Sequence, residues 1–157
     1  MTTSAPTGWL FSGVHLAGAR SEASAPEGIA LTPAGRVALV SGDAAIRQSI
    51  MLLLTTIPGE RVMRPDYGCP LHRLVFSPND ATTAGLAIHY VRQALIRFEP
   101  RVEIVALDAT GAQVVEQHAE DDEPAQPNKL VISLSYKVKA TNRLGSLQLE
   151  LGLDGGG

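Results

Sequence analysis

The sequence predicts an α+β domain in which two main helices pack on one face of a small antiparallel β-sheet. Two stretches, at about 43–57 and 79–98, repeat apolar residues at helical spacing. Three later stretches, at about 101–109, 129–140 and 146–153, alternate apolar with other residues, as strands do. Alternation gives each strand one face for a core, and the helices are expected to cover that face.

Composition and charge indicate a globular protein with no affinity for nucleic acid or membranes. The 157 residues suit one domain with a modest core, and 45% of them are hydrophobic. The net charge is −3 and the 13 Lys and Arg residues are scattered, whereas nucleic acid and membrane surfaces need a basic patch. The longest strongly apolar run, 50–54, is too short to span a bilayer, and no signal peptide is expected. With Cys69 as its single cysteine, the chain is expected to reside in the cytoplasm or to leave it within something larger.

The start of the chain is expected to be partly flexible. Residues 1–28 are rich in Gly, Ala, Ser and Pro but include the apolar stretch "GWLFSGVHL". This stretch is either a tail with a few residues held on the body, or an apolar anchor that orders against a partner. Two apolar runs around Pro33-Ala34-Gly35 indicate a hairpin-like turn. The predicted parts are an N-terminal extension at 1–40, one domain at 41–154 and a flexible glycine tail at 155–157.

The first helix, at about 43–57, is predicted from apolar residues that follow at spacings of four, three, one and three. Ser41 or Asp43 is expected to cap its start, and Pro58-Gly59 to end it. The residues predicted to face the core are Ile46, Ile50, Leu53, Leu54 and Ile57.

The stretch "GERVMRPDYGCPLHRLVFSP" is too irregular for a long helix or strand. Val62 and Met63 are expected to pair briefly as a strand, and Pro65-Asp66-Tyr67-Gly68 indicates a turn. The following "PLHRLVF" predicts one or two helical turns whose inward residues are Leu71, Leu74 and Val75.

The second helix is predicted to begin near Ser77-Pro78-Asn79-Asp80, which resembles a capping box. It is expected to stop before Pro100, because proline cannot continue a helix and also restricts Glu99 before it. Its buried residues are predicted to be Ala84, Ala87, Ile88, Val91, Leu95 and Phe98.

The three strands differ in how clearly they alternate. In the first, both faces are fairly apolar, with Val102, Ile104 and Ala106 on one of them. The loop at 116–128 is acidic and is expected to be solvated, while "TNRLG" predicts a tight turn before the last strand. That strand is a candidate edge that offers unpaired backbone to another chain. The inward sets predicted for the second and third strands are Leu130, Ile132, Leu134, Tyr136 and Val138, then Leu147, Leu149, Leu151 and Leu153.

The sequence gives little support for metal, cofactor or nucleophile chemistry. Cys69 has His72 three residues later, but a lone cysteine beside a proline is more often a small packing residue. No nucleophile elbow or phosphate-binding glycine loop is present. The histidines lack the spacing of metal ligands; they are His15, His72, His89 and His118.

Three carboxylates, on Glu60, Asp66 and Glu99, raise the possibility of glycosidase chemistry, which uses two carboxyl groups at a fixed separation. A general acid needs an apolar setting that raises its pKa, whereas these acids alternate with arginines. An ion-pair network is therefore the favoured interpretation, with no catalytic residue. The arginines at hand are Arg61, Arg64 and Arg101.

Two motifs carry a family resemblance: "IRQSIMLLLTTIPGERVMRPDYGCPLHRLVF" and, some twenty residues later, "FEPRVEI". With these motifs the chain resembles the GPW family of baseplate wedge proteins, from about Ile46 to Leu153. That family includes the TssE component of type VI secretion and equivalents in phage tails and contractile injection particles. The first forty residues do not align with it, and the loop at 116–128 is longer than usual.

The resemblance implies a sheath-handshake-like baseplate wedge domain with a structural, non-enzymatic role and no cofactor. Such a protein would join the wedge core bundle to the first sheath ring and template sheath assembly. The implied partners are wedge core-bundle proteins, the sheath protein and a central hub or tube initiator, in a sixfold assembly with several copies of this chain. The particle would be phage-tail-like and assembled in the cytoplasm.

The resemblance also implies where partners bind. Glu99, Pro100 and Arg101 match the family's core-contact motif. They raise two possibilities, a docking point or a tie within the domain's own corner, and the resemblance favours docking. A second set, Arg64, Asp66 and Tyr67, is either a staple for its turn or a second contact. Sheath arms would add at the last strand, whose outward residues include Gln148 and Glu150. The alternatives are a lysozyme-like muramidase and a small regulatory adaptor of the same fold.

Overall fold

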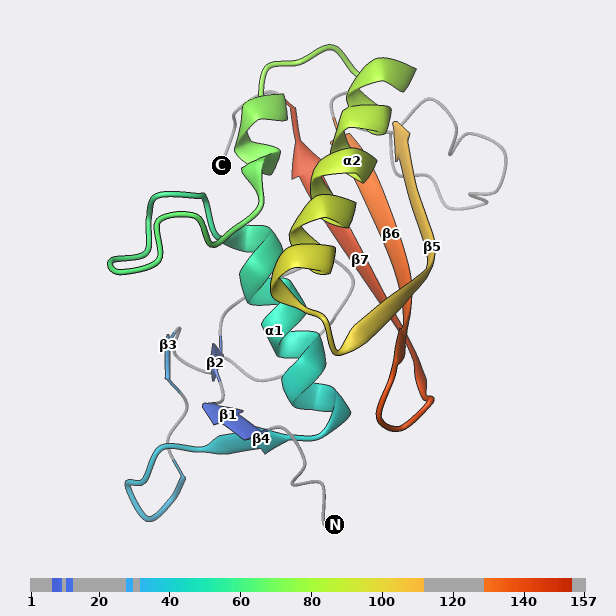
Figure 1. Ribbon diagram of the computed structural model, residues 1–157. Coiled ribbons are helices and arrows are strands. Elements are labelled where there is room, and N and C mark those ends of the chain that lie inside the picture. The colour runs from blue at the N-terminus through green and yellow to red at the C-terminus, as the bar shows by residue number, and fades with distance from the viewer. Residues whose placement is uncertain (1–6, 10, 13–27, 30–31, 112–128, 154–157) are drawn as a thin grey trace, which may run out of the picture.

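The computed structural model describes residues 7–9, 11–12, 28–29, 32–111 and 129–153. Two α-helices and a short 3₁₀ helix lie against one face of a three-stranded antiparallel sheet with strand order β5-β6-β7 (Figure 1). This arrangement confirms the predicted α+β class. The elements are α1 (Asp43–Thr55), η1 (Pro70–Leu74), α2 (Ala81–Phe98), β5 (Val102–Gly111), β6 (Lys129–Val138) and β7 (Leu144–Gly152).

Helix α1 confirms its predicted apolar stripe, although its ends differ from the prediction. Gly42 occupies the N-cap with φ of 66°, so Ser41 is not the cap. Asp43 instead accepts hydrogen bonds from Thr141 and Arg143 in the turn between β6 and β7. The helix ends at Thr55. Ile57, the last residue predicted to face the core, therefore lies beyond the helix and is 37% exposed. The buried residues are Ala45, Ile46, Ile50, Leu53 and Leu54.

Helix α2 begins two residues later than predicted, because the cap is Asp80. Its carboxylate accepts a hydrogen bond of 2.8 Å from the backbone N–H of Thr83, which satisfies a free donor of the first turn. The Thr83 hydroxyl donates to the carbonyl of Pro78 and fixes the entering chain. Of the predicted stripe, Ala87, Val91 and Leu95 are fully buried and the other members are partly buried.

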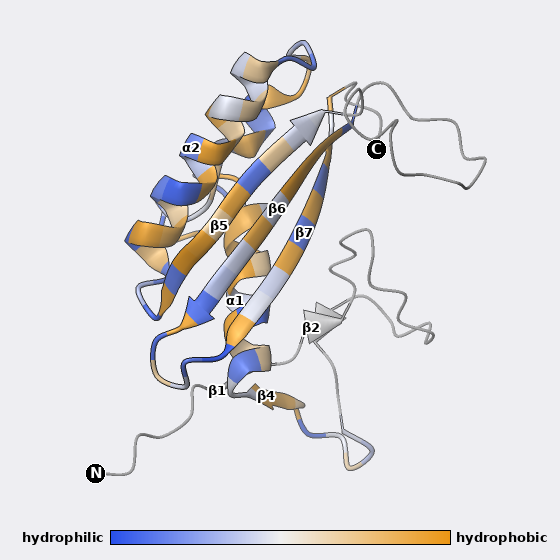
Figure 2. Cartoon of the chain, turned by 90° about the vertical axis from the view of Figure 1, so that its right-hand side faces the viewer, coloured by the Kyte–Doolittle hydropathy of each residue, from blue (hydrophilic) through white to orange (hydrophobic). Residues whose placement is uncertain are grey.

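Strand β6 lies at the centre of the sheet, and every second residue along it is buried, as predicted. Figure 2 shows this alternation of hydrophobic and hydrophilic residues along the strands. Its inward set packs under both helices together with the inward residues of β7. The buried set on β6 is Leu130, Ile132, Leu134, Tyr136 and Val138.

Strand β5 departs from its prediction at a bulge. Its register against β6 shifts between Ile104 and Ala106, which leaves Val105 58% exposed. The extra residue moves the later side chains to the opposite face, so Leu107 and Ala109 point inward in place of Ala106. Strands β5 and β7 are the two outer strands of this sheet, as predicted for β7.

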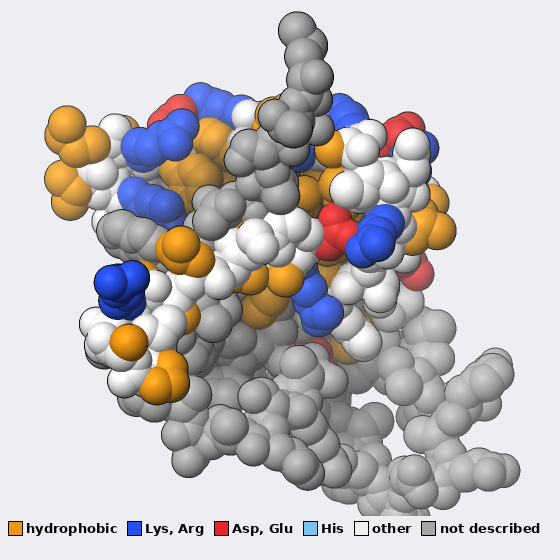
Figure 3. Space-filling view, turned by 90° about the horizontal axis from the view of Figure 1, so that it is seen from below, with side chains coloured by type: hydrophobic (Ala, Val, Ile, Leu, Met, Phe, Trp, Pro, Cys, Tyr) orange, Lys and Arg blue, Asp and Glu red, His pale blue; other side chains and the backbone are white. Residues whose placement is uncertain are grey.

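The segment between α1 and η1 is a projecting loop, and the predicted pairing of Val62 and Met63 as a strand is wrong. Both side chains are about nine-tenths exposed, and Met63 has φ of 69°, which no strand residue adopts. Figure 3 shows hydrophobic side chains at the left edge of the molecule with Lys and Arg side chains beside them. The predicted helical turns are confirmed as η1, which buries Leu71 and Leu74.

Short strands near the start of the chain pair with the residues that precede α1. Strand β1 (Thr7–Trp9) pairs with β4 (Leu39–Ser41), and β2 (Phe11–Ser12) pairs with β3 (Gly28–Ile29). The turn predicted at Pro33-Ala34-Gly35 is confirmed by hydrogen bonds between its neighbouring backbone groups. The acidic stretch, the glycine tail and most of residues 1–28 lie outside the described residues.

Candidate functional site

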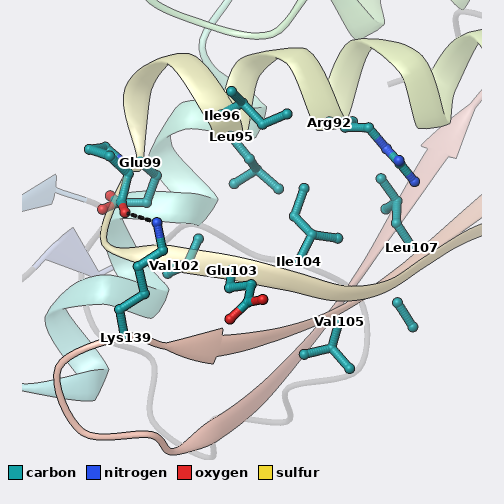
Figure 4. A pocket seen from close by; sticks show the side chains of 12 residues that line it. Arg92, Leu95, Ile96, Glu99, Val102, Glu103, Ile104, Val105, Leu107 and Lys139 are labelled. Carbon is teal, nitrogen blue, oxygen red and sulfur yellow. Dashed lines mark hydrogen bonds between the residues drawn. The ribbon is translucent and has the colours of Figure 1, made fainter.

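The corner between α2 and β5 is made by Glu99, Pro100 and Arg101, and its backbone is fixed on several sides. The N–H of Glu99 closes the last turn of the helix, and its carbonyl accepts from Val102 at 3.3 Å. Proline then prevents a further helical turn. Lys139, after β6, binds the corner twice. Its Nζ donates to the carbonyl of Pro100 at 2.8 Å (Figure 4). Its backbone N–H donates to the carbonyl of Arg101 at 3.0 Å. The corner is therefore a rigid support for side chains.

Glu99 lies inside this corner and holds Arg101 in place. The Glu99 side chain is 2% exposed, and it accepts two hydrogen bonds from the guanidinium, 2.5 Å from Nε and 2.7 Å from Nη2. The Ser49 hydroxyl of α1 donates to the same carboxylate at 2.6 Å. Arg101 itself is 45% exposed, and its hydrogen bond to Glu99 raises the pKa of the guanidinium. Glu99 thus orients Arg101, while the arginine remains accessible from outside.

The second predicted set lies against the end of α2, next to this corner. The ring of Tyr67 packs on Phe98 with centroids 5.2 Å apart, and the Arg61 guanidinium lies 4.3 Å from the centre of the tyrosine ring. Burial raises the pKa of the Tyr67 hydroxyl, and nearby arginines that include Arg64 and Arg101 act against the rise. Because Tyr67 packs on Phe98 and Asp66 pairs with Arg97, the structure brings the loop against the end of α2, next to the corner.

The carboxylates have partners that differ in part from those expected. Glu99 pairs with Arg101 as predicted, but Asp66 pairs with Arg97 at 2.5 Å. The Glu60 carboxylate accepts a hydrogen bond from the backbone N–H of Ile57 at 3.0 Å. The prediction that Glu60 pairs with an arginine is therefore wrong. Sequence reasoning missed Arg97, for which the only signal was a cation in the last turn of a helix.

A groove of about 490 Å³ runs from the corner between α2 and β5 (Figure 4). Ile96 on the helix is 70% exposed and Val105 at the bulge is 58% exposed, so the groove presents apolar surface to the outside. Glu103 on its rim pairs across the strands with Lys137 at 3.2 Å. The bulge of β5, which the sequence did not reveal, lies within the lining of the groove. Its lining includes Arg92, Leu95, Ile96, Glu99, Pro100, Val102, Glu103, Ile104, Val105, Ala106, Leu107 and Lys139.

The predicted residues of the last strand lie apart from the corner. Gln148 and Glu150 are on β7, which is separated from β5 by the whole width of β6 (Figure 1). Gln148 is exposed opposite Ser133, and Glu150 lies 3.6 Å from the Nζ of Lys129. The structure therefore contains two separate candidate surfaces, the corner with its loop and the outer edge of β7.

The remaining chemical candidates are Cys69 and the histidines, of which His15 and His118 lie outside the described residues. Burial raises the pKa of the Cys69 thiol to about 12, so it stays protonated and does not form a nucleophilic thiolate with His72. In the part of the chain that the structure describes, no group of three or more His, Cys, Asp or Glu could hold a metal ion. Across residues 7–9, 11–12, 28–29, 32–111 and 129–153, no helix is long and apolar enough to cross a membrane.

Comparison with family models gives a match to "Baseplate wedge protein gp25" over residues 40–143, about two thirds of the chain. The chain belongs to this family of baseplate wedge proteins. The matched range includes the loop, the corner and the groove. A structural role in a baseplate follows from family membership, and the resemblance seen in the sequence is confirmed.

Two solved structures share the fold of this chain. A Geobacter sulfurreducens protein described as a candidate tail lysozyme is 36% identical to this wedge protein, over 77% of this chain and 99% of that chain, with a TM-score of 0.61. A chain in the baseplate of the anti-feeding prophage shares the fold at 19% identity, over 96% of this chain and 87% of that chain, with a TM-score of 0.57. Comparison with curated proteins found no match.

Proposed function

We propose that this wedge protein joins the wedge core bundle to the first sheath ring of a contractile injection machine and templates the sheath. The observation that carries the proposal is Arg101, a half-exposed guanidinium held on a rigid corner by a buried carboxylate. Glu99 occupies one edge of the planar fork, and the remaining donors can bind a partner carboxylate or the free carbonyls at the end of a partner helix. Because the orientation is set before binding, little side-chain entropy is lost on docking.

The groove beside the corner suits the wedge core protein. It offers Ile96 and Val105 as apolar contacts next to the Arg101 guanidinium. Protein interfaces commonly combine an apolar centre with polar groups at the rim in this way. A partner element that fills the groove would place its end near Pro100 and Arg101. The corner therefore acts as a docking point in this proposal, and Glu99 contributes by positioning Arg101.

The outer edge of β7 suits the sheath. An outer strand has backbone N–H and C=O groups that an added strand can pair with, and such pairing needs no special side chains. Gln148 lies along this edge and is exposed. Repetition of the chain around a sixfold baseplate would then present several such edges to the first ring, with a central hub or tube initiator inside it.

The proposal includes no enzymatic activity, although one relative is described as a candidate tail lysozyme. A glycosidase needs one general acid whose pKa is raised and one carboxylate that is free to act as nucleophile or base. Here Glu99 is held by Arg101 and Ser49, and Asp66 is held by Arg97. Cell-wall hydrolysis measured with Glu60, Asp66 and Glu99 replaced one at a time tests this; activity in the wild type that one of these changes removes would refute it.

Co-purification tests the assembly role. The tagged chain is co-expressed with the wedge and sheath proteins of its particle, beside Arg101→Ala and the control Arg73→Ala, an exposed arginine on η1 outside the site. We expect the wild type and Arg73→Ala to recover both partners, and Arg101→Ala to lose the wedge protein while still folded by circular dichroism. Gln148→Lys is expected to lose only the sheath protein. A wild type that purifies alone would refute the proposal.

A further inference from the structure

The loop of residues 57–68, named here the tip loop, is closed at its base by the body of the domain. It leaves after Thr56 and returns at Cys69, whose N–H donates to the carbonyl of Thr56 at 3.0 Å. Gly68 has φ of 132°, and a Cβ there would lie 2.4 Å from that same carbonyl oxygen, so only glycine allows the two ends to meet. From this base the loop projects away from the helices (Figure 1).

Hydrogen bonds within the tip loop give it one defined shape. Backbone N–H groups donate to carbonyls three residues earlier at Glu60, Arg64 and Tyr67, which makes a series of turns. The Glu60 carboxylate accepts from the N–H of Ile57, and the Tyr67 ring packs on Phe98. The loop is therefore preorganised, which lowers the entropy lost when it binds.

The far end of the tip loop is apolar, with an arginine on either side of it in the chain. Val62 and Met63 are 90% and 92% exposed, and Met63 has φ of 69°, a conformation unfavourable for a side chain of its type. Exposed Arg61 and Arg64 flank this pair. Asp66 is paired with Arg97 outside the loop, so Glu60 is the loop carboxylate that opposes Arg61 and Arg64, and the loop keeps a net positive charge. Hydrophobic side chains with Lys and Arg side chains beside them are visible at the left edge of Figure 3.

We infer that the tip loop docks on a neighbouring baseplate protein by inserting Val62 and Met63 into an apolar pocket rimmed by carboxylates. The positive charge of the loop favours carboxylates around the partner's pocket, and the shape of the loop favours a protein as the partner. Two apolar side chains on a fixed turn match a preformed pocket, whereas anchoring in a lipid surface takes a longer apolar face with several cations. This inference rests on the proposed function and adds a second contact to it, separate from Arg101.

A double variant, Val62→Ser with Met63→Asn, removes the apolar tip. Asparagine tolerates positive φ, so the loop keeps its backbone, and both side chains are exposed, so the domain keeps its core. Phe76→Asn is the matched control, because Phe76 is also exposed, at 80%, with φ of 72°. Arg64→Gln tests the rim. The probe is the set of wedge and sheath proteins co-expressed with each tagged variant, quantified by mass spectrometry.

We expect the double variant to recover one baseplate protein at least about tenfold less than the wild type does, and the control to recover it fully. Arg64→Gln should reduce the recovery of the same protein, and the wild-type interaction should weaken as salt is raised. A photo-crosslinker in place of Met63 should then attach to an apolar pocket of that protein.

Two results would overturn the inference while the proposed function stands. One is full recovery of every partner by the double variant. The other is binding of the wild type, but not of the double variant, to vesicles of phosphatidylcholine with phosphatidylserine, which would assign the tip to a lipid surface. Failure of the proposed function looks different, because the wild type would then recover no baseplate protein at all, and the inference would fall with it.

Discussion

Arg101→Ala is expected to destabilise the isolated domain as well as to weaken docking. The substitution leaves the Glu99 carboxylate, which is 2% exposed, with the Ser49 hydroxyl as its remaining side-chain hydrogen bond. Breaking a fully buried ion pair costs about 3–5 kcal/mol, whereas exposed pairs contribute about 0–1 kcal/mol. Arg101 is 45% exposed, so water enters part of the space that it vacates. The expected loss lies between these limits, at about 2 kcal/mol.

Urea unfolding followed by circular dichroism measures this loss, and for a chain of this size it corresponds to a fall in Tm of roughly 4–8 °C. The physical cause is tested by adding Glu99→Gln to Arg101→Ala. A neutral amide needs no cation beside it, so the double variant should recover about 1 kcal/mol relative to Arg101→Ala alone.

Two outcomes would refute this reasoning. If Arg101→Ala costs less than about 0.5 kcal/mol, the Glu99–Arg101 pair behaves as a surface ion pair, and the Glu99 carboxylate does not need the arginine to remain buried. If Glu99→Gln adds to the loss and does not offset it, the buried charge is not the source of the cost. In the first case the loss of partners by Arg101→Ala would report on contact alone.

Three further predictions concern stability. Burial raises the pKa of the Cys69 thiol to about 12 from an ordinary 9.0, so the folded state keeps a proton that the unfolded state releases. The free energy of unfolding should therefore fall as pH rises from 9 toward 12. The native thiol should react with a thiol reagent only after unfolding. Gly68→Ala places a Cβ 2.4 Å from the Thr56 carbonyl oxygen and should cost about 2–4 kcal/mol in urea unfolding. The N–H of Thr83 lowers the pKa of Asp80, so the cap contributes stability above the ordinary carboxyl pKa of 3.8 and loses it as pH falls below that; Asp80→Ala should lower Tm at pH 7 and flatten this acid dependence, whereas Asp80→Asn should keep the Tm at pH 7.

Local periodicity was enough to predict the main elements. The stripe from Ile46 to Leu54 specifies α1, and the strict alternation from Leu130 to Val138 specifies β6, because side-chain direction along a helix or strand repeats with a fixed period. Pro100 was enough to end α2 and to turn the chain into β5. The family resemblance then identified the corner and the loop as candidate partner-binding residues.

Periodicity failed where a single residue breaks the repeat. The bulge near Val105 reverses the faces of β5 and lies in the lining of the groove, yet nothing in the local alternation marks it. The tip at Val62 and Met63 has the composition of a strand but a backbone that cannot be one. Pairing with β6 decided the first outcome, and closure of the loop between Thr56 and Cys69 decided the second; neither is marked in the local sequence.

The sequence by itself determined the α+β class, the main helices and strands, and the pair Glu99 and Arg101 at the end of α2. Only the tertiary structure decided their roles. Ser49 and Glu99 are fifty residues apart in the chain yet share a hydrogen bond of 2.6 Å, and Asp66 finds Arg97 thirty-one residues away. Such contacts depend on how α1, the tip loop and α2 pack together, and packing is a property of the whole chain. For that reason the sequence could name Glu99 and Arg101 together, but only the fold shows that one is buried and the other presented outward.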